Sequence, residues 1–430
     1  MTDEDVARIA SPPNDPGTRA EEPHRLRPPG CPRLDISVIS SNFTWGGSED
    51  LWSETAARFA EAGHRVTVYK NRLSRGEGNV DRLRALSCRL VELARFPLLP
   101  KKLFSLVGLI AHRLSVASQT LRLYSHLRFR RRPHLVVVSQ GGNYDGWPIA
   151  DVCRRLKLPY VLISQKASDL YWPDDRWRPR VRRVYEDALH SFFVSEHNRR
   201  LTEEQIGVRL ARATVVRNPF KVPWNDPPEW PADDGIFRLA CVARFYIKEK
   251  GQDLLMRVLA APKWRERQIE VTLFGSGEHH EALRELAAFL NLSNLRFGGF
   301  VSDIRAIWAA HHALLLPSRA EGLPLVVVEA MLSGRVPIVT NVAGNPEVVD
   351  DNVTGFLAAA ATEDAVDEAL ERAWQARDRW PEIGRAAAAS IRELVPPDPA
   401  GTLAGRLLDI AAARLPRGTA PGAALPEAAE

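Results

Sequence analysis

Residues 321–329 read Glu-Gly-Leu-Pro-Leu-Val-Val-Val-Glu. A short apolar run at 313–316 precedes them and is typical of a buried parallel strand. Residues 325–332 are apolar except for Glu329, a pattern that predicts a buried helix after the strand. The stretch therefore indicates a strand–loop–helix unit of an α/β protein, with one acid ahead of the helix and one inside it.

The two acids, Glu321 and Glu329, bracket the N-terminus of the expected helix. We expect the helix to begin near residues 322–323, with Pro324 in its first turn, where a missing N–H costs little. Free N–H groups at a helix N-terminus attract anionic or hydroxyl-rich ligands, and carboxylates there can accept hydrogen bonds from vicinal sugar hydroxyls. The alternative is that Glu321 caps the helix and Glu329 is a solvated helix residue.

A second strand and a second glycine-containing turn follow at 333–340 and 344–347. Together these motifs resemble the donor-binding signature of glycosyltransferase family 4, in which seven residues separate two glutamates. The resemblance runs from about residue 239 to residue 357, with weaker traces in the first half. It implies the GT-B fold, an α/β architecture of two Rossmann-like, doubly wound domains that face a central cleft.

The composition is that of a soluble globular protein, with 45% apolar and 26% charged residues in 430. The formal net charge of +5 is too modest to indicate a nucleic-acid partner, and no apolar stretch is long enough to span a membrane. Residues 1–30 lack the apolar segment of a signal peptide. The four cysteines lack metal-ligand spacing, which favours reduced thiols in a cytoplasmic protein.

The order of elements and a proline-rich stretch predict the domain boundaries. Five prolines and little periodicity between residues 218 and 235 indicate an interdomain linker. We expect a disordered tail at 1–32, an N-terminal Rossmann-like domain at 33–218, a linker at 219–235, a C-terminal Rossmann-like domain at 236–385, further helices at 386–415 and a disordered tail at 416–430. The resemblance implies that the first domain binds the acceptor, that the second binds the donor, and that the C-terminal helices at 386–415 return to the first domain.

The first half begins with a strand–glycine loop–helix–strand unit at 34–69. Its glycine pair, Gly46 and Gly47, either allows a phosphate or sugar to approach the backbone or simply makes a tight turn. The pair matches the glycines that face the cleft in family 4. Two later strands, at 135–139 and 160–164, end in polar loops at the edge where α/β sheets bind ligands.

These two loops carry the acceptor-side candidates Asp145, Gln165, Lys166 and Asp169. Many family members have a histidine where this chain has Gln165, so Asp145, Lys166 or Asp169 is left as a possible substitute. Loop carboxylates of this kind are also often helix caps. The choice between these roles stays open.

A basic segment at 101–132 predicts one or two amphipathic helices. It fits either a helical hairpin with a solvated basic face or attachment to an anionic membrane surface. The second interpretation would place the protein peripherally at the inner face of the cell membrane, where lipid-linked acceptors lie.

The loop after an expected strand at 237–243 carries three cations, Arg244, Lys248 and Lys250. The resemblance implies that Arg244 and the lysine of Lys250-Gly251 grip a diphosphate, although this loop is one residue longer than usual and Lys248 competes for the role. Fixed cations stabilise a leaving diphosphate more in the transition state than in the ground state. The alternative is two surface cations.

The resemblance implies a retaining transfer of a hexose-type sugar from a nucleotide sugar to a glycan or lipid-linked acceptor, in cell-surface polysaccharide or glycoconjugate synthesis. Glu329 would bind ribose hydroxyls, Glu321 with the backbone of 322–325 the sugar, and Val301 the nucleobase. No metal or other cofactor is expected. The candidate residues are Arg244, Lys250 and Glu321 for catalysis, and Gly46, Gly47, Gly275, Gly277, Val301, Gly322, Leu323, Pro324, Leu325 and Glu329 for donor binding.

Two other functions fit the same motifs. One is a non-catalytic nucleotide-sugar-binding partner of a polysaccharide assembly system, which the absence of the family histidine at Gln165 favours. The other is a different reaction of the same fold, such as sugar epimerisation or inverting transfer. The sequence does not identify the sugar, the nucleobase or the acceptor.

Overall fold

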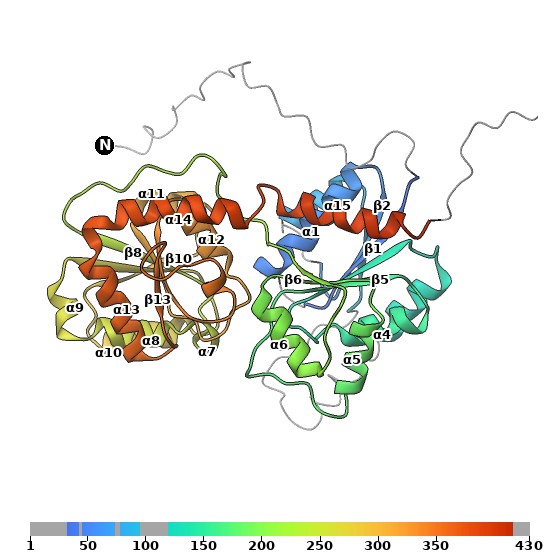
Figure 1. Ribbon diagram of the computed structural model, residues 1–430, viewed down its shortest axis with the longest axis horizontal. Coiled ribbons are helices and arrows are strands. Elements are labelled where there is room, and N and C mark those ends of the chain that lie inside the picture. The colour runs from blue at the N-terminus through green and yellow to red at the C-terminus, as the bar shows by residue number, and fades with distance from the viewer. Residues whose placement is uncertain (1–31, 43–44, 74–77, 95–118, 416–430) are drawn as a thin grey trace, which may run out of the picture.

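The computed structural model describes residues 32–42, 45–73, 78–94 and 119–415 (Figure 1). The predicted tail at 416–430 lies outside these residues, as do the predicted N-terminal tail up to residue 31 and the basic segment up to residue 118.

The first domain is built on a parallel sheet of seven strands in the order β3-β2-β1-β4-β5-β6-β7. Alternate residues of β1 enter two separate apolar cores, with Ile36 and Val38 in one and Ile39 in the other. Helices therefore cover both faces, as parallel sheets require. The strands are β1 Asp35–Ser40, β2 Arg65–Lys70, β3 Arg89–Glu92, β4 Leu135–Gln140, β5 Tyr160–Ser164, β6 Ser191–Phe193 and β7 Ala213–Val215. Its helices include α1 Gly47–Glu61, α2 Gly78–Ala85, α4 Trp147–Arg155, α5 Arg178–Glu186 and α6 Glu196–Ile206.

The second domain repeats this plan with six parallel strands in the order β10-β9-β8-β11-β12-β13. Leu239 and Ala240 of β8 again face different cores. The strands are β8 Phe237–Val242, β9 Ile269–Phe274, β10 Leu295–Gly299, β11 Ala313–Leu316, β12 Val336–Thr340 and β13 Phe356–Ala358. The helices are α7 Ile247–Lys250, α8 Gln252–Leu259, α9 Pro262–Glu266, α10 His280–Phe289, α11 Ile304–Ala310, α12 Leu325–Leu332, α13 Glu363–Gln375 and α14 Trp380–Leu394, with short 3-10 turns η2 Asn345–Glu347 and η3 Arg377–Arg379.

Strand order reverses between β1 and β4 in the first sheet and between β8 and β11 in the second. Such reversals open a crevice at the carboxyl ends of the strands, where α/β proteins bind ligands. The prediction of two Rossmann-like, doubly wound domains is confirmed.

The start of α12 corrects one prediction. The helix begins at Leu325, with Pro324 as an extended N-cap residue, and not near residues 322–323. Leu323 precedes a proline and is therefore driven away from helical backbone angles. The Gly322 carbonyl already accepts a hydrogen bond from the Gly344 N–H at 2.9 Å.

The chain crosses between the domains twice. The segment 219–235 packs on the second domain, where the buried Arg335 side chain donates hydrogen bonds to the carbonyls of Pro228 (3.2 Å) and Glu229 (2.5 Å). The last helix, α15 Pro399–Ala412, lies against α1 of the first domain (Figure 1). Within the described part of the chain, none of the helices combines the length and the apolar character needed to cross a membrane.

Candidate active site

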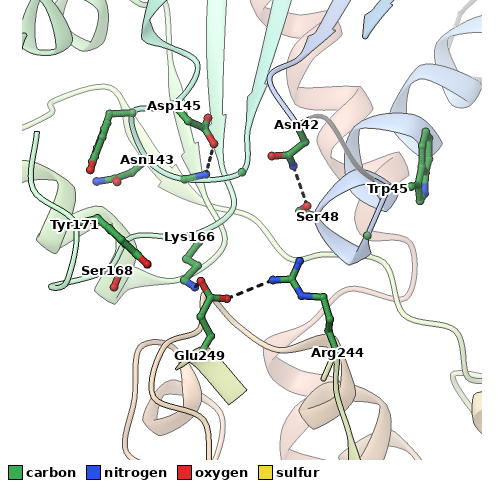
Figure 2. A pocket seen from close by; sticks show the side chains of 14 residues that line it. Asn42, Trp45, Ser48, Asn143, Asp145, Lys166, Ser168, Tyr171, Arg244 and Glu249 are labelled. Atoms are coloured by element: carbon green, nitrogen blue, oxygen red, sulfur yellow. Dashed lines mark hydrogen bonds and ion pairs between the residues drawn. The ribbon is translucent and has the colours of Figure 1, made fainter. Parts of the chain in front are cut away.

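A cavity of about 410 Å³ lies between the two domains (Figure 2). The first domain lines it with the loops that follow β1, β4 and β5, which include Asn42, Asp145 and Lys166. The second domain contributes Arg244 and Glu249 from the loop and turn after β8. The cavity thus opens where both sheets reverse their strand order.

The Glu249 carboxylate joins a cation from each domain. Its Oε1 atom lies 2.7 Å from Lys166 Nζ, and its Oε2 atom lies 3.5 Å from an Arg244 nitrogen. Arg244 is 60% exposed and stacks on the Tyr246 ring, with 5.1 Å between guanidinium carbon and ring centroid. The Arg244 guanidinium is therefore accessible to an anion that enters the cavity.

Lys250 and Glu321 form a direct ion pair, with 2.6 Å between Lys250 Nζ and Glu321 Oε1. Ser318 Oγ donates to the same carboxylate oxygen at 2.7 Å. Both side chains are largely buried, whereas Lys248 is exposed. The structure thus brings two predicted catalytic residues together, and it shows that Glu321 holds Lys250 instead of capping α12.

The loop around Glu321 is fixed by the turn that carries Lys250. The Glu249 carbonyl accepts hydrogen bonds from the backbone N–H groups of Arg319 (2.7 Å) and Ala320 (3.2 Å). Helix α7 therefore aligns the lysine with the carboxylate.

Glu329 has a different partner from Lys250 and Glu321. It is buried, so it is not the solvated helix residue of the alternative interpretation. Its Oε1 atom accepts a hydrogen bond from the Lys221 N–H at 3.0 Å, and the Lys221 ammonium in turn lies 3.2 Å from Asp50 of α1. Burial raises the pKa of Glu329 to about 7.

Several predicted glycines make close contacts that a side chain would block. A Cβ atom on Gly275, which has a φ of +139°, would lie 2.1 Å from the Ala243 carbonyl oxygen, and one on Gly277 would lie 2.4 Å from that of Phe245. These two glycines let their loop pack on the end of β8. Val301 packs against the apolar core beneath α12.

Two other glycines touch the opposite domain. A Cβ atom on Gly322 would lie 2.1 Å from the Gln165 carbonyl oxygen, and one on Gly47 would lie 3.0 Å from a Leu325 methyl group. Gly46 lines the cavity and has open space around it. The loop that carries Glu321 and Gly322 and the first-domain loops therefore meet across the domain boundary.

The acceptor-side candidates occupy different places. Asp145 lines the cavity and accepts hydrogen bonds from Ser41 Oγ and the Gly142 N–H, both at 2.7 Å. Although Asp145 faces the cavity, the surrounding protein desolvates its carboxyl and raises its pKa. Asp169 is exposed and does not line the cavity.

Gln165 is buried beside the cavity. Its Oε1 atom accepts a hydrogen bond from Asn218 at 2.9 Å, and its Nε2 atom has no hydrogen-bond partner among the described residues. An unpaired buried donor is costly, so this amide is suited to a ligand oxygen.

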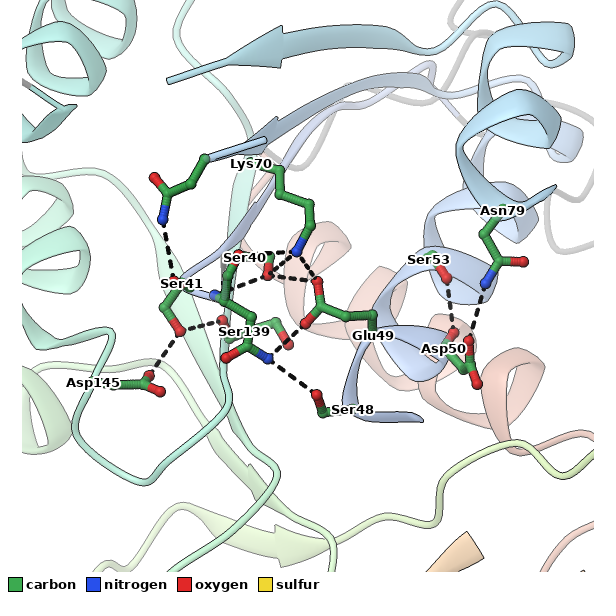
Figure 3. A network of polar contacts seen from close by, with 12 residues as sticks. Ser40, Ser41, Ser48, Glu49, Asp50, Ser53, Lys70, Asn79, Ser139 and Asp145 are labelled. Carbon is green, nitrogen blue, oxygen red and sulfur yellow. Dashed lines mark hydrogen bonds and ion pairs between the residues drawn. The ribbon is translucent and has the colours of Figure 1, made fainter. Parts of the chain in front are cut away.

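Sequence reasoning missed a buried network under the first glycine loop (Figure 3). Glu49 and Lys70 form an ion pair with almost no exposed side-chain surface. Glu49 also accepts hydrogen bonds from Ser40 (2.8 Å) and from the Asn42 amide (2.7 Å), which lines the cavity. Lys70 follows four uncharged strand residues, 66–69, and a charge in this position was the available signal of a buried ion pair.

The described residues contain no group of three or more His, Cys, Asp or Glu side chains placed to hold a metal ion. Cys88, Cys153 and Cys241 are buried and free, and burial raises the pKa of each thiol.

Both halves of the chain match described protein families. Residues 46–219 match the family described as "Glycosyl transferase 4-like domain", and residues 236–376 match the family described as "Glycosyl transferases group 1". The two matches contain the loops after β4 and β5 and the residues Arg244, Lys250 and Glu321.

Individual relatives and solved structures agree with these families. A glycogen synthase of Pseudomonas syringae pv. syringae is 36% identical over 137 residues, or 32% of this chain and 28% of that enzyme. A GDP-mannose-dependent alpha-(1-6)-phosphatidylinositol monomannoside mannosyltransferase of Mycobacterium tuberculosis is 31% identical over 34% of this chain and 41% of its own length. The chain therefore spans less than half of either relative.

The structure of Anabaena Alr3699/HepE in complex with UDP and glucose superposes with a TM-score of 0.69. The match covers 89% of this chain and all of that one, at 17% sequence identity. At that identity the likeness shows a shared fold.

Proposed function

We propose that this chain, which belongs to the group 1 glycosyltransferases, moves a hexose-type sugar from a nucleotide-sugar donor to an acceptor hydroxyl with retention of configuration. The family matches confirm the resemblance seen in the sequence. The observation that carries the proposal is the Lys250–Glu321 ion pair. Lys250 lies on the same helical turn as Glu249, which lines the interdomain cavity and pairs with the accessible Arg244.

The donor diphosphate would bind Arg244 and Lys250 and would replace Glu249 as the partner of Arg244. Breaking the glycosidic bond adds negative charge to the diphosphate, and two cations fixed before the reaction stabilise that charge. Glu321 and the backbone of 322–325 would bind the sugar hydroxyls. Glu329 would use its second carboxylate oxygen for a ribose hydroxyl.

The acceptor would bind on the first-domain side of the cavity. Asp145 and Lys166 supply charged groups there, and the unpaired Gln165 Nε2 can donate to a sugar oxygen. Attack would come from the face that the diphosphate leaves, and the departing phosphate would help to remove the acceptor proton. Gly322 abuts the Gln165 carbonyl across the domain boundary, and such close approach of the domains would limit hydrolysis by water.

We propose a glycan or lipid-linked acceptor, because one relative is named a glycogen synthase and another is named for a phosphatidylinositol monomannoside. A cytoplasmic enzyme could reach lipid-linked acceptors through the basic segment 101–132. Its described helix at 119–129 leaves Leu121 and Phe129 exposed. Cosedimentation with vesicles that contain anionic lipid tests this contact, and recovery of all protein in the supernatant would contradict it.

Replacement of either diphosphate cation tests the assignment. Arg244→Ala and Lys250→Ala should each lower turnover of the nucleotide sugar by about two to four powers of ten, the scale of losing one charge-stabilising group. Lys248→Ala, which removes an exposed cation from the same turn, should keep wild-type turnover. Near wild-type rates in both of the first two variants would end the assignment.

The alternative is a non-catalytic nucleotide-sugar binder, which Gln165 favours because the family resemblance implies a histidine at this position. Calorimetry with UDP-, GDP- and ADP-sugars, beside a donor-hydrolysis assay, separates the two functions. Tight binding without turnover would establish the binder. If transfer occurs, the anomeric configuration of the product by NMR tests retention.

A further inference from the structure

A carboxylate of the second domain binds the N-terminus of a helix in the first. The Glu347 side chain accepts a hydrogen bond from the Glu196 N–H at 3.0 Å and another from the His197 N–H at 2.8 Å. Glu347 belongs to the turn η2, and the two N–H groups belong to the first turn of α6. Figure 1 shows α6 at the edge of its domain that faces the second domain.

This contact completes the cap of α6. The first N–H groups of a helix have no acceptor within the helix. Ser195, the N-cap residue, accepts from the Asn198 N–H at 3.2 Å through its side chain. Glu347 accepts from the Glu196 and His197 N–H groups, so the cap is divided between the domains. A negative charge at this end of a helix is also favoured by the helix dipole.

The surroundings of Glu347 strengthen the contact. The Arg217 guanidinium lies 3.6 Å from its carboxylate, and each of the two side chains has less than a fifth of its surface exposed. Hydrogen bonds to an ionised group are stronger than neutral ones, and partial burial limits screening by salt. We name this set, Glu347 with the N–H groups of Glu196 and His197, the interdomain clasp.

The clasp is tied to the donor loop. Gly344, three residues before Glu347, donates its N–H to the Gly322 carbonyl at 2.9 Å. A Cβ atom on Gly344 would lie 2.9 Å from the Ser195 Cβ, and Gly322 itself abuts the Gln165 carbonyl. One turn therefore contacts both the α6 cap and the loop that carries Glu321.

We propose that Glu347 is a positioning residue: through the interdomain clasp it holds the second domain closed on the first and sets the donor loop against the acceptor side. The closed arrangement is a property of the chain itself, whereas its effect on transfer rests on the proposed function. Loss of the two charge-assisted hydrogen bonds should shift the closing equilibrium by about 10- to 100-fold toward the open form.

Small-angle scattering of the full chain without substrate tests the clasp. Glu347→Gln keeps the shape of the side chain but replaces one acceptor oxygen with a donor, so it should enlarge the radius of gyration. Glu196→Pro removes one of the two N–H donors. Proline is favoured at the first helical position, and Ser195 before it already has the extended backbone that proline requires (φ −146°, ψ 157°).

Glu196→Ala is the matched control, because it removes the same side chain and keeps the N–H. We expect wild-type scattering for this control, a larger radius for Glu196→Pro and for Glu347→Gln, and no further increase in the double variant. In the donor assay, Glu196→Pro and Glu347→Gln should both lower kcat. The Kd of the nucleotide sugar, which would bind the second domain, should stay at its wild-type value.

Wild-type scattering from both Glu196→Pro and Glu347→Gln would overturn the proposal, and so would a wild-type protein whose scattering fits only an open arrangement. Circular dichroism confirms that α6 is still folded in each variant. Because scattering needs no substrate, failure of the clasp would leave the proposed function standing.

Discussion

At the scale of single residues, Glu329 is the clearest source of a pH effect. Burial raises its pKa from 4.5 to about 7. A carboxyl whose pKa is higher in the folded than in the unfolded state destabilises the fold as pH rises through that interval. Glu329→Gln keeps an oxygen for the Lys221 N–H and loses the ionisable group. Its free energy of unfolding should therefore rise relative to that of wild type by up to about 3 kcal/mol between pH 4.5 and pH 7.5.

Urea unfolding of wild type and Glu329→Gln at a series of pH values measures this gain. The difference between their free energies of unfolding should grow between pH 4.5 and 7 and then level off. A difference that does not change with pH would show that Glu329 ionises as an ordinary exposed acid does.

The site residues show what a sequence can and cannot place. The meeting of Lys250 and Glu321 was predictable, because both belong to motifs that follow neighbouring parallel strands of one sheet. The pair of Glu49 and Lys70 was predictable only in part: the position of Lys70 signals a buried charge, but its partner depends on how β2 aligns with β1 beneath a helix. Glu249 was missed because its partner Lys166 comes from the other domain.

At the scale of elements, one glycine joins two helices next to Lys250. Gly251 ends α7 and precedes α8, with a φ of +64° that disfavours other residues. A Cβ atom there would lie 2.1 Å from the Pro317 carbonyl oxygen. Gly251→Ala should therefore lose about 2 kcal/mol of stability or more from strain and the clash, and it should lower donor turnover by displacing Lys250.

The matched control is Gly405→Ala in α15, where a Cβ atom meets nothing within 4 Å. Alanine in a helix is favoured over glycine, so this variant should keep activity and gain about 0.5–1 kcal/mol. Thermal unfolding and donor hydrolysis measure both effects. Equal behaviour of the two variants would mean that the loop can relax away from Pro317.

Apolar runs predicted the buried strands well, even where the runs were short, whereas they did not predict where α12 begins or that α7 is a helix. The buried strands β1 and β11 lie where their apolar residues indicate. Helix α12 begins later than predicted, because Pro324 excludes helical backbone at Leu323. Helix α7 has four residues, too few to show a helical period in the sequence.

At the scale of the whole molecule, the last helix of the chain, α15, packs on the first domain, and periodicity alone does not reveal this. Apolar residues of α15 predict a buried face but not the domain that buries it. The structure places that face on α1, more than three hundred residues earlier in the chain. Contacts such as Gly322 with Gln165 likewise depend on how the finished domains approach each other.

The position of α15 leads to a prediction about domain stability. Leu407 is fully buried in the core that also contains Leu51 and Trp52 of α1. Leu407→Ala should therefore destabilise the first domain by about 2–5 kcal/mol, the usual cost of a cavity left by a buried leucine. Although residue 407 follows the second domain in the chain, that domain should keep its own stability.

Hydrogen exchange resolved by mass spectrometry tests this prediction. Leu407→Ala should show faster exchange in β1 and β4 and unchanged exchange in β8 and β11. Asp409→Ala, which changes an exposed residue of the same helix, is the control. Equal loss of protection in both sheets would show instead that the two domains unfold as one cooperative unit.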